Sequence, residues 1–305
     1  MPPATPRRCF ATPRRCLALT RKGIRCSLTS SSTLKDELGR DVAEPLRRGG
    51  NHCAFHARPF CTRPAEEFTG AAIVLLLDLE TSGLDVSRDL VVEIAATEAP
   101  SDPAALGASF ATVVSGAPDP GDAPAVHGIA AEEIARGPSF SEAWSRFVAF
   151  AEGLLDLSLQ EEPEDSEDED APRPARPPSE PPQLLVLAHN GVRFDFALLL
   201  FECQRHSLSW SPLERWLFVD TLDVLRAFGA EGLGGCLKLQ CLARVAGGAE
   251  GLRAHRALDD CVALRGVMEC LAARSGVGLL ELLRPFAVQL DAVASMAHVS
   301  VLCES

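Results

Sequence analysis

The sequence predicts an α/β domain in which five strands are flanked by helices, preceded by a small basic N-terminal region that contains Cys and His. Two observations predict this class. From residue 71 onward, short apolar runs typical of buried strands are followed by stretches with the period of a helix. The 305 residues are 47% hydrophobic and 23% charged, which is ordinary for a globular protein with a sizeable core and excludes a wholly disordered or collagen-like chain.

Three strands are expected first. Residues 73–79 and 90–96 are apolar runs separated by a turn segment that contains Gly, Asp and Ser, and residues 109–114 form a third run. Apolar residues then recur at helical spacing, which predicts a helix over residues 139–157.

A segment rich in acidic residues and Pro follows this helix. Residues 161–170 hold eight acids in ten positions, and a Pro-rich stretch continues to residue 182. Like charges at this density repel, and neither half can bury apolar area. We therefore interpret residues 158–182 as a solvated, disordered insertion.

The second half of the domain alternates strands with helices. Strands are expected over residues 184–188 and 216–219. The helices expected here, including a final stretch that has helical period but carries no recognisable chemistry, are residues 194–206, 221–228, 237–245, 258–273 and 279–301. The longest uninterrupted apolar run, residues 71–77, is far shorter than the ~20 residues that cross a bilayer, so no membrane span is expected.

Charge divides the chain near residue 63. Residues 1–63 hold thirteen Lys and Arg against four Asp and Glu, a net charge of +9 within a chain of net charge −13. A basic arm on an acidic body occurs in nucleic-acid-binding proteins, although such arms also serve as targeting segments. The first 35 residues lack acids and are rich in Arg, Ser and Thr, so a plastid or mitochondrial transit peptide is an open alternative.

The cysteines indicate a reducing compartment. Eleven cysteines in 305 residues are too sparse for a disulfide scaffold, and no secretory signal precedes them, so we expect an intracellular protein of the nucleus or cytoplasm. Three thiols and one imidazole in the N-terminal region could hold one structural Zn²⁺: Cys16, Cys26, Cys53 and His56. Unrelated buried thiols are an equal alternative, and Cys9 and Cys61 could substitute as ligands.

Two carboxylates stand at the end of the first expected strand. Asp78 and Glu80 are two residues apart, so their side chains point to the same face of a strand. A buried pair of like charges is costly unless a cation neutralises it, and carboxylate oxygens suit Mg²⁺ or Mn²⁺. The alternative is a solvated loop edge.

Two further clusters strengthen the metal interpretation. Asp195 falls in a first helical turn after the strand at 184–188, where its alternative role is a helix cap. His255 and Asp260 stand at the start of a later helix. Five residues of helix would rotate the imidazole away from Asp260, so we expect His255 on the preceding loop. Glu93 on the second strand is interpreted as a turned-out or supporting group.

These clusters resemble the DEDDh family of 3′→5′ exonucleases, also called DnaQ-like or RNase T-like, over about residues 71–274. The chain contains no Tyr, which excludes the sister branch that has a Tyr in place of the His. The spacing of the second motif is closest to the three-prime repair exonucleases. The matching segments are Leu77-Asp-Leu-Glu-Thr-Ser-Gly-Leu84, Ala188-His-Asn-Gly-Val-Arg-Phe-Asp195 and His255-Arg-Ala-Leu-Asp-Asp260, with accessory matches Val126-His-Gly-Ile129 and Val219-Asp-Thr-Leu222.

The resemblance implies a ribonuclease H-like mixed five-stranded sheet and a two-metal hydrolase. His255 would accept a proton from water, and spacing from it favours Asp260 over Asp259 as a ligand. Thr81 and Leu84 would contact the terminal nucleotide, with Asn190 as a polar neighbour. Two Mg²⁺ or Mn²⁺ ions would be held by Asp78, Glu80, Asp195 and Asp260.

The implied domains are a basic arm with the Cys/His region over residues 1–70, an exonuclease domain over 71–274 and a helical tail over 275–305. The implied substrates are the 3′ ends of single-stranded DNA or RNA, with release of nucleoside monophosphates. The sequence does not distinguish DNA from RNA, and it leaves the oligomeric state open, although related enzymes are often homodimers. Two alternatives remain: a catalytically weak nucleic-acid-binding adaptor, and a zinc-finger interaction protein with a nuclease-like body.

Overall fold

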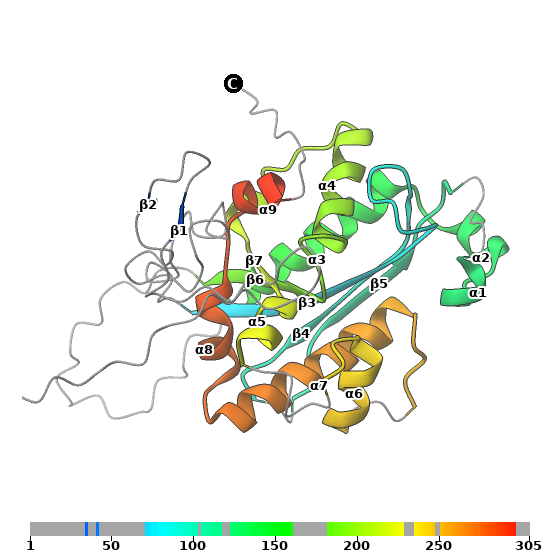
Figure 1. The fold of residues 1–305 in the computed structure, drawn as a ribbon. Helices are drawn as coiled ribbons and strands as arrows, with labels where there is room; N and C mark the ends of the chain where they lie inside the picture. The colour runs from blue at the N-terminus through cyan, green and yellow to red at the C-terminus, as the bar shows by residue number, and fades with distance from the viewer. Residues whose placement is uncertain are drawn as a thin grey trace, which may run out of the picture. The chain divides into compact units, whose positions relative to one another are not determined.

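The computed structural model describes residues 34–35, 41–42, 71–102, 105–117, 123–160, 182–228, 235–247 and 251–296 (Figure 1). The chain divides into two compact units, Met1–Thr62 and Arg63–Ser305. In the first unit, β1 (Leu34–Lys35) pairs with β2 (Asp41–Val42) in antiparallel orientation. The four residues predicted to bind zinc, Cys16, Cys26, Cys53 and His56, lie outside the described residues.

The second unit is built on a five-stranded sheet with the order β5-β4-β3-β6-β7. β4 is antiparallel to both of its neighbours, whereas β6 and β7 run parallel to β3. This arrangement confirms the predicted ribonuclease H-like mixed sheet. The strands are β3 (Ala72–Thr81), β4 (Val91–Ala99), β5 (Ser109–Val113), β6 (Gln183–Ala188) and β7 (Leu217–Asp220).

The central strand β3 is apolar on both faces because helices cover both. Leu75, Leu77 and Leu79 belong to one buried cluster, and Val74 and Leu76 to another. Alternate residues of a strand point to opposite faces, so a strand buried on both sides reads as a continuous apolar run. This is why the strand is recognisable in the sequence.

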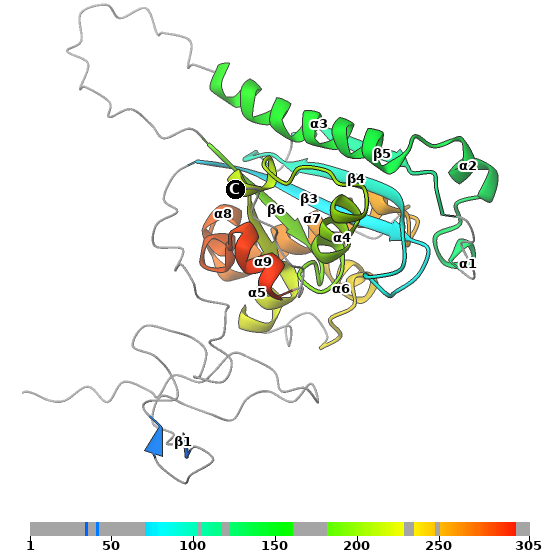
Figure 2. The same ribbon diagram turned by 90° about the horizontal axis from the view of Figure 1, so that it is seen from above.

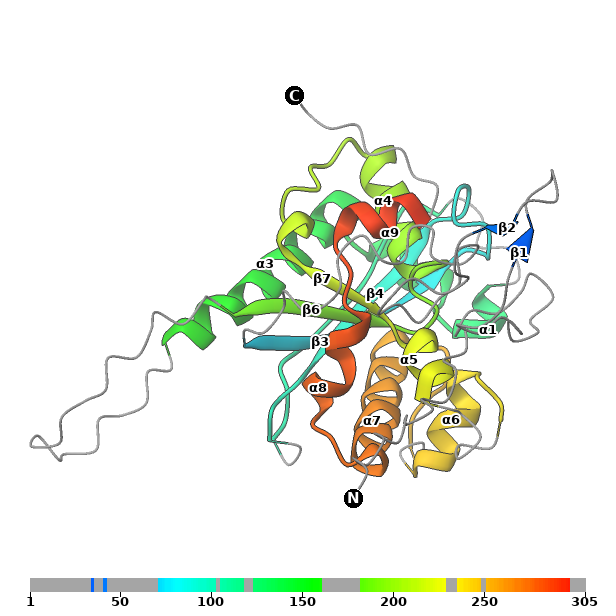
Figure 3. The same cartoon turned by 60° about the vertical axis from the view of Figure 1, so that its left-hand side comes forward.

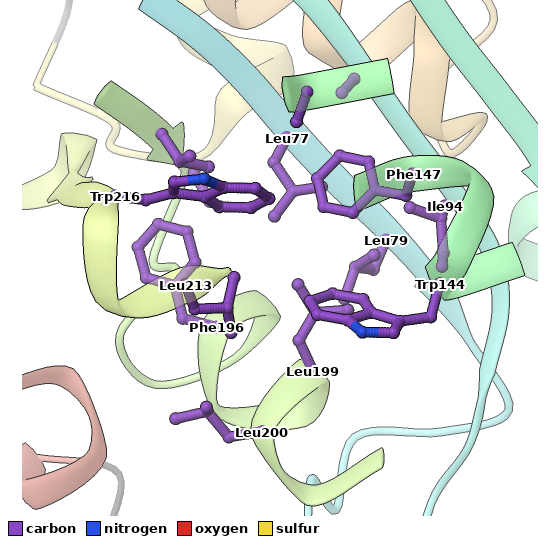
Figure 4. Packing of buried hydrophobic residues seen from close by; sticks show 14 of the residues in the cluster. Leu77, Leu79, Ile94, Trp144, Phe147, Phe196, Leu199, Leu200, Leu213 and Trp216 are labelled. Carbon is purple, nitrogen blue, oxygen red and sulfur yellow. The ribbon is translucent and has the colours of Figure 1, made fainter. Parts of the chain in front are cut away.

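One face of the sheet carries α3 (Phe140–Gln160), α4 (Asp195–Arg205) and α9 (Leu290–Met296). Figure 4 shows the aromatic side chains that fill this side, with Trp216 beside Phe147. Their ring centroids lie 5.9 Å apart in an edge-to-face arrangement. Trp216 follows η2 (Leu213–Arg215), and its indole N–H donates to Glu152 at 2.9 Å.

The opposite face carries α5 (Thr221–Phe228), α6 (Leu239–Ala246), α7 (Ala257–Ser275) and α8 (Leu279–Leu283) (Figures 1 and 2). Apolar residues of these helices pack on Val74, Leu76 and the corresponding residues of β4, β6 and β7. Among the described residues, we find no helix with the length and apolarity that a bilayer crossing needs.

Two short helices, α1 (Pro124–His127) and α2 (Ala131–Arg136), are absent from the sequence prediction. Four and six residues are too few for a helical period to emerge from the sequence. Helix α3 is longer than expected and continues to Gln160, so residues 158–160 of the predicted insertion are helical. Residues 161–181 lie outside the described residues.

The segment over residues 279–301, expected to be helical from its period, is interrupted in the structure, which describes it as far as Met296. The segment contains α8, then η4 (Arg284–Phe286), then α9, with α8 beside α7 and α9 beside α4 (Figure 3). Pro285 lacks the N–H that a continuing helix needs. Val288 instead exchanges two backbone hydrogen bonds with Phe218 of β7, at 2.8 and 2.9 Å, which extends the sheet edge.

Candidate active site

Asp78 and Glu80 lie near the carboxyl end of β3, on the face that α7 covers. Their neighbours Leu77 and Leu79 point to the other side and fill the aromatic core (Figure 4). Asp78 is partly exposed, whereas Glu80 is 9% exposed. The β3–β4 register shifts directly after Glu80, and such irregularities bend a strand and redirect its side chains.

Asp195 reaches the same end of β3 from the first turn of α4. Its side chain is buried, and its Oδ1 accepts a hydrogen bond from the Leu79 N–H at 3.1 Å. This bond fastens the second motif to the first between the two carboxylates of β3. The alternative prediction, a helix-capping Asp, does not fit, because the cap residue of α4 is Phe194 and the acceptor role of Asp195 is toward β3.

His255 lies on the loop before α7, and Asp260 lies in the first turn of that helix. The N–H of His255 donates to Asp260 Oδ2 at 3.2 Å. One ligand atom each from Glu80, His255 and Asp260 lie within 4.8 Å of one another. Asp259 points elsewhere: its Oδ2 accepts the Arg253 N–H at 3.1 Å and Nε–H at 3.2 Å, which holds the preceding loop.

The acids of the cluster have raised pKa values. For Asp78, desolvation is the largest cause of the increase and repulsion by the other acids adds to it, so its pKa lies well above the usual range. The same two causes raise the pKa of Glu80 to about 8. Desolvation also raises the pKa of Asp195 to about 7 and that of Asp260 above its ordinary value.

These raised pKa values indicate that burial and repulsion outweigh the positive charge near the site. Arg256 lowers the pKa of Glu80 and His255 lowers that of Asp260, but both pKa values remain raised. Hard divalent cations prefer carboxylate oxygens and would relieve the repulsion. Carboxylate oxygens of this kind fit Mg²⁺ or Mn²⁺. Of the four predicted ligands, Glu80 and Asp260 belong to the group of close ligand atoms with His255, whereas Asp78 and Asp195 lie outside that group.

Of the three predicted substrate residues, Thr81 is the buried last residue of β3, whereas Leu84 and Asn190 lie on the turns that follow β3 and β6. The Thr81 hydroxyl donates to Gly83 O at 2.6 Å, which tightens the turn after β3. Leu84 stands on this turn with its side chain 86% exposed. Asn190 is partly exposed and adopts a left-handed backbone with φ of 67°. An exposed leucine beside a polar cluster is available to a ligand and adds nothing to the core.

The turn that carries Leu84 is braced from two directions. Asp89 accepts hydrogen bonds from the Ser82 hydroxyl at 3.1 Å and from the Asp85 N–H at 2.8 Å. Arg205 of α4 donates to the carbonyl oxygen of Asp89 at 3.4 Å. The exposed position of Leu84 is therefore set by polar contacts on both sides of the turn.

No family model and no curated protein matches the sequence. Solved structures do match. One is a structure that shows 3′-end specific recognition of histone mRNA stem-loop by a 3′-exonuclease. It has 13% identity over 69% of this chain and 85% of that chain, with a TM-score of 0.49. The nuclease domain of 3′hExo, a DEDDh family member, bound to rAMP, has 13% identity over 69% of this chain and 96% of that chain, with a TM-score of 0.48.

A third match is E. coli exonuclease I in complex with a dA16 oligonucleotide, at 19% identity and a TM-score of 0.46. It covers 66% of this chain and 41% of that chain. These likenesses concern the fold alone.

Asp220, at the end of β7, organises the loop that leads to Asp195. Its carboxylate accepts the N–H groups of Asn190, Val192 and Leu222 at 3.1, 3.3 and 3.0 Å. Desolvation and repulsion by Asp223 raise its pKa to about 6. The sequence offers a signal for this role, since an acid directly after a buried strand stands at the sheet edge where the neighbouring parallel strand also ends.

His189 is a structural histidine beside this loop. Its Nε2 lies 2.8 Å from the carbonyl oxygen of Leu237, which can only accept, so Nε2 carries the proton. Nδ1 lies 3.0 Å from the Thr221 hydroxyl oxygen, and that hydroxyl also lies 3.3 Å from its acceptor, the carbonyl oxygen of Ala188. Burial lowers the pKa of His189, consistent with a neutral ring that holds the loop in place.

His127 of the Val126-His-Gly-Ile129 segment is a buried histidine to which the sequence assigns no role. Its Nδ1 accepts the Ile129 N–H at 3.0 Å, so the proton resides on Nε2. In the part of the chain that the structure describes, that Nε2 has no hydrogen-bond partner. Burial lowers its pKa, with smaller effects from Glu93, Arg256 and His255.

Proposed function

We propose that this chain is a metal-dependent 3′→5′ exonuclease of the DEDDh type, which hydrolyses phosphodiester bonds at the 3′ end of DNA or RNA and releases nucleoside monophosphates. One observation carries the proposal: ligand atoms of Glu80, Asp260 and His255 lie within 4.8 Å of one another, and repulsion by Asp195, Asp260 and Glu80 helps to raise the pKa of Asp78. Perturbed acids gathered at one place are typical of catalytic sites.

The proposed ligands are the four carboxylates of the cluster. Asp78 and Glu80 are fixed by the strand, Asp195 by its bond to Leu79, and Asp260 by the first turn of α7. When bound, two divalent ions supply the positive charge that lowers the pKa of a water molecule and offsets the charge on the leaving 3′ oxygen. The protein's contribution is to hold the carboxylates at fixed positions despite their mutual repulsion.

His255 is the proposed general base. The backbone N–H of His255 donates to Asp260, whereas the imidazole is exposed. The ring can therefore contact a water molecule at the edge of the carboxylate cluster. An imidazole exchanges protons near neutral pH, which suits the removal of a proton from the attacking water. Thr81 and Leu84 are proposed to hold the terminal nucleotide, with Asn190 beside it.

The closer assignment to the three-prime repair branch rests on the spacing of the second motif, from His189 to Asp195. In this proposal residues 71–274 form the exonuclease domain, and the basic residues of 1–70 recruit the acidic substrate. The set Cys16, Cys26, Cys53 and His56 is retained as a proposed structural zinc site.

The test uses single-stranded DNA and RNA oligonucleotides labelled at the 5′ or 3′ end. With Mg²⁺, 5′-labelled substrate should shorten stepwise, and 3′-labelled substrate should release labelled mononucleotide at once; a chelator should stop both. Asp78→Asn should reduce hydrolysis to background. Glu142→Gln, which removes an exposed acid paired with Arg146 on α3, is the matched control and should retain activity.

Internal cleavage, or no shortening with either Mg²⁺ or Mn²⁺, would contradict the proposal. A catalytically weak adaptor would bind the oligonucleotides without shortening them, so a binding measurement alongside the gels separates the two functions.

A further inference from the structure

Glu93 is a buried acid of β4 that the proposed chemistry does not use. It lies directly opposite Glu80 in the β3–β4 register and is 3% exposed. Of the two interpretations of Glu93 made from the sequence, the turned-out group is therefore wrong, and the supporting group fits its burial. Two carboxylates opposite each other on neighbouring strands repel, so a buried acid at this position needs a compensating partner.

That partner is the residue next to His255. Arg256 Nη2 donates to Glu93 Oε1 at 2.7 Å, and Arg256 Nε donates to Oε2 at 3.2 Å, which is a two-point guanidinium–carboxylate pair. A second, exposed acid, Glu133 of α2, lies 3.8 Å from the same guanidinium. Because long, solvent-exposed pairs contribute little, Glu93 is the partner that fixes Arg256.

Glu93 also holds the start of α7. Arg256 is the cap residue of that helix and makes no side-chain cap hydrogen bond. The Ala257 N–H, the first of the helix, donates instead to Glu93 Oε2 at 3.0 Å. An acid supplied from the sheet thus satisfies a free N–H at the positive end of the helix. With three donors on its two oxygens, Glu93 is committed to this turn.

His255 lies directly before this anchored pair and has an unusual backbone. Its φ is 63°, in the left-handed region that non-glycine residues occupy only when their surroundings hold them there. On one side its N–H is tied to Asp260, at 3.2 Å. On the other side Glu93 holds Arg256 and Ala257. The direction of the imidazole therefore depends on both anchors.

We propose that Glu93 and Arg256 form a positioning pair that fixes the turn of His255, and so aims its imidazole at the carboxylate cluster. The catalytic consequence rests on the proposed exonuclease function. Neither residue contacts the substrate in this proposal; both act through His255. The pair connects β4, the strand next to the central β3, to the turn at the start of α7, across 163 positions in the sequence.

The decisive variant is Arg256→Lys. It keeps the positive charge beside Glu93 but loses the two-point geometry of the guanidinium. Loss of such a supporting contact lowers activity about 10–100-fold in comparable sites, and here the loss should appear in kcat with KM little changed. Glu133→Gln is the matched control, because it removes the exposed acid near the same guanidinium, and it should leave kcat unchanged.

A double-variant comparison separates positioning from a general structural role. In a His255→Ala background, Arg256→Lys should cause no further loss of kcat, because the group it positions is gone. A further loss equal to that in the wild type would overturn the proposal. Glu93→Gln should behave like Arg256→Lys, and melting temperatures of all variants establish that each is folded.

A readout without catalysis keeps this test separate from that of the proposed function. The imidazole resonances of His255 are assigned in proton–carbon spectra by comparison with His255→Gln. They should shift or broaden in Arg256→Lys and stay in place in Glu133→Gln. If the wild type hydrolyses nothing while these resonances shift, the exonuclease proposal fails and the positioning pair stands. Unchanged resonances in Arg256→Lys would overturn the pair.

Discussion

The Leu79 N–H donates to Asp195 Oδ1 at 3.1 Å, although 116 positions separate the two residues. The bond joins α4 to β3 at the point where Asp78 and Glu80 lie on either side of Leu79 along the strand. Asn at position 195 keeps an oxygen acceptor for this N–H, whereas Ala does not.

Asp195→Asn should therefore abolish hydrolysis without loss of stability. It removes one charge from a cluster whose members repel one another and keeps the bond to Leu79. Asp195→Ala should be destabilised by about 1–3 kcal/mol, because the buried N–H of Leu79 is left without a partner. Urea unfolding in a metal-free buffer measures both. Equal stability of the two variants would show that the bond contributes nothing.

Divalent ions should stabilise the protein in proportion to their binding. Added Mn²⁺ or Mg²⁺ should relieve the repulsion among Asp78, Glu80, Asp195 and Asp260 and so raise the melting temperature. At an ion concentration a hundred times the dissociation constant, the unfolding free energy should increase by about 2.7 kcal/mol. Asp260→Asn should reduce this gain, whereas Glu142→Gln should not. A thermal scan with and without a chelator checks it, and equal gains in both variants would argue against the site.

Asp220 predicts a specific pH dependence of stability. Its pKa in the folded protein is about 6, above the ordinary 3.8, so the folded state holds the proton more tightly than the unfolded chain. The stabilisation from this proton is complete at pH values below the unfolded pKa and is lost as the pH rises through about 4 to 6. Asp220→Asn should flatten that part of the profile. Unfolding free energies at several pH values test this; an unchanged slope would contradict it.

Gly191 should not tolerate a side chain. A Cβ there would lie 2.7 Å from the Cβ of Ala188 and 2.8 Å from the ring of Phe196, and neither can move aside without disturbing β6 or α4. Gly191→Ala should cost about 1–3 kcal/mol. Gly153→Ala in α3, where a Cβ meets nothing within 4 Å, should instead stabilise the protein by about 0.5–1 kcal/mol. Chemical unfolding distinguishes the two.

Leu84→Ala should weaken substrate binding and leave stability unchanged, since the side chain is 86% exposed. The expected effect is a raised KM for oligonucleotides. Leu106→Ala is the control, because Leu106 is 99% exposed but lies between β4 and β5, at the opposite end of β4 from the turn of Leu84. If both variants behave like the wild type, Leu84 is not a substrate contact.

Local sequence patterns determined most of the helices and strands, and the placement of Asp78, Glu80, His255 and Asp260 on their own elements. The two-residue period of a strand is enough to put Asp78 and Glu80 on one face. A helical repeat placed Asp260 at the start of α7 and left His255 on its loop. The short helices α1 and α2 were not predicted because they are too short to show a helical period. The break of the C-terminal stretch at Pro285 was not predicted because it depends on pairing with a distant strand.

Only the tertiary structure decided what these residues meet. Leu79 with Asp195, Glu93 with Arg256 and Phe218 with Val288 are pairs distant in sequence, and no local periodicity encodes which strand lies next to which. Asp259 and Asp260 are adjacent acids in the sequence, and the rotation of one helical residue directs one to Arg253 and the other to His255. Periodicity fixes the direction of a side chain relative to its own element, whereas its neighbours depend on how separate elements pack.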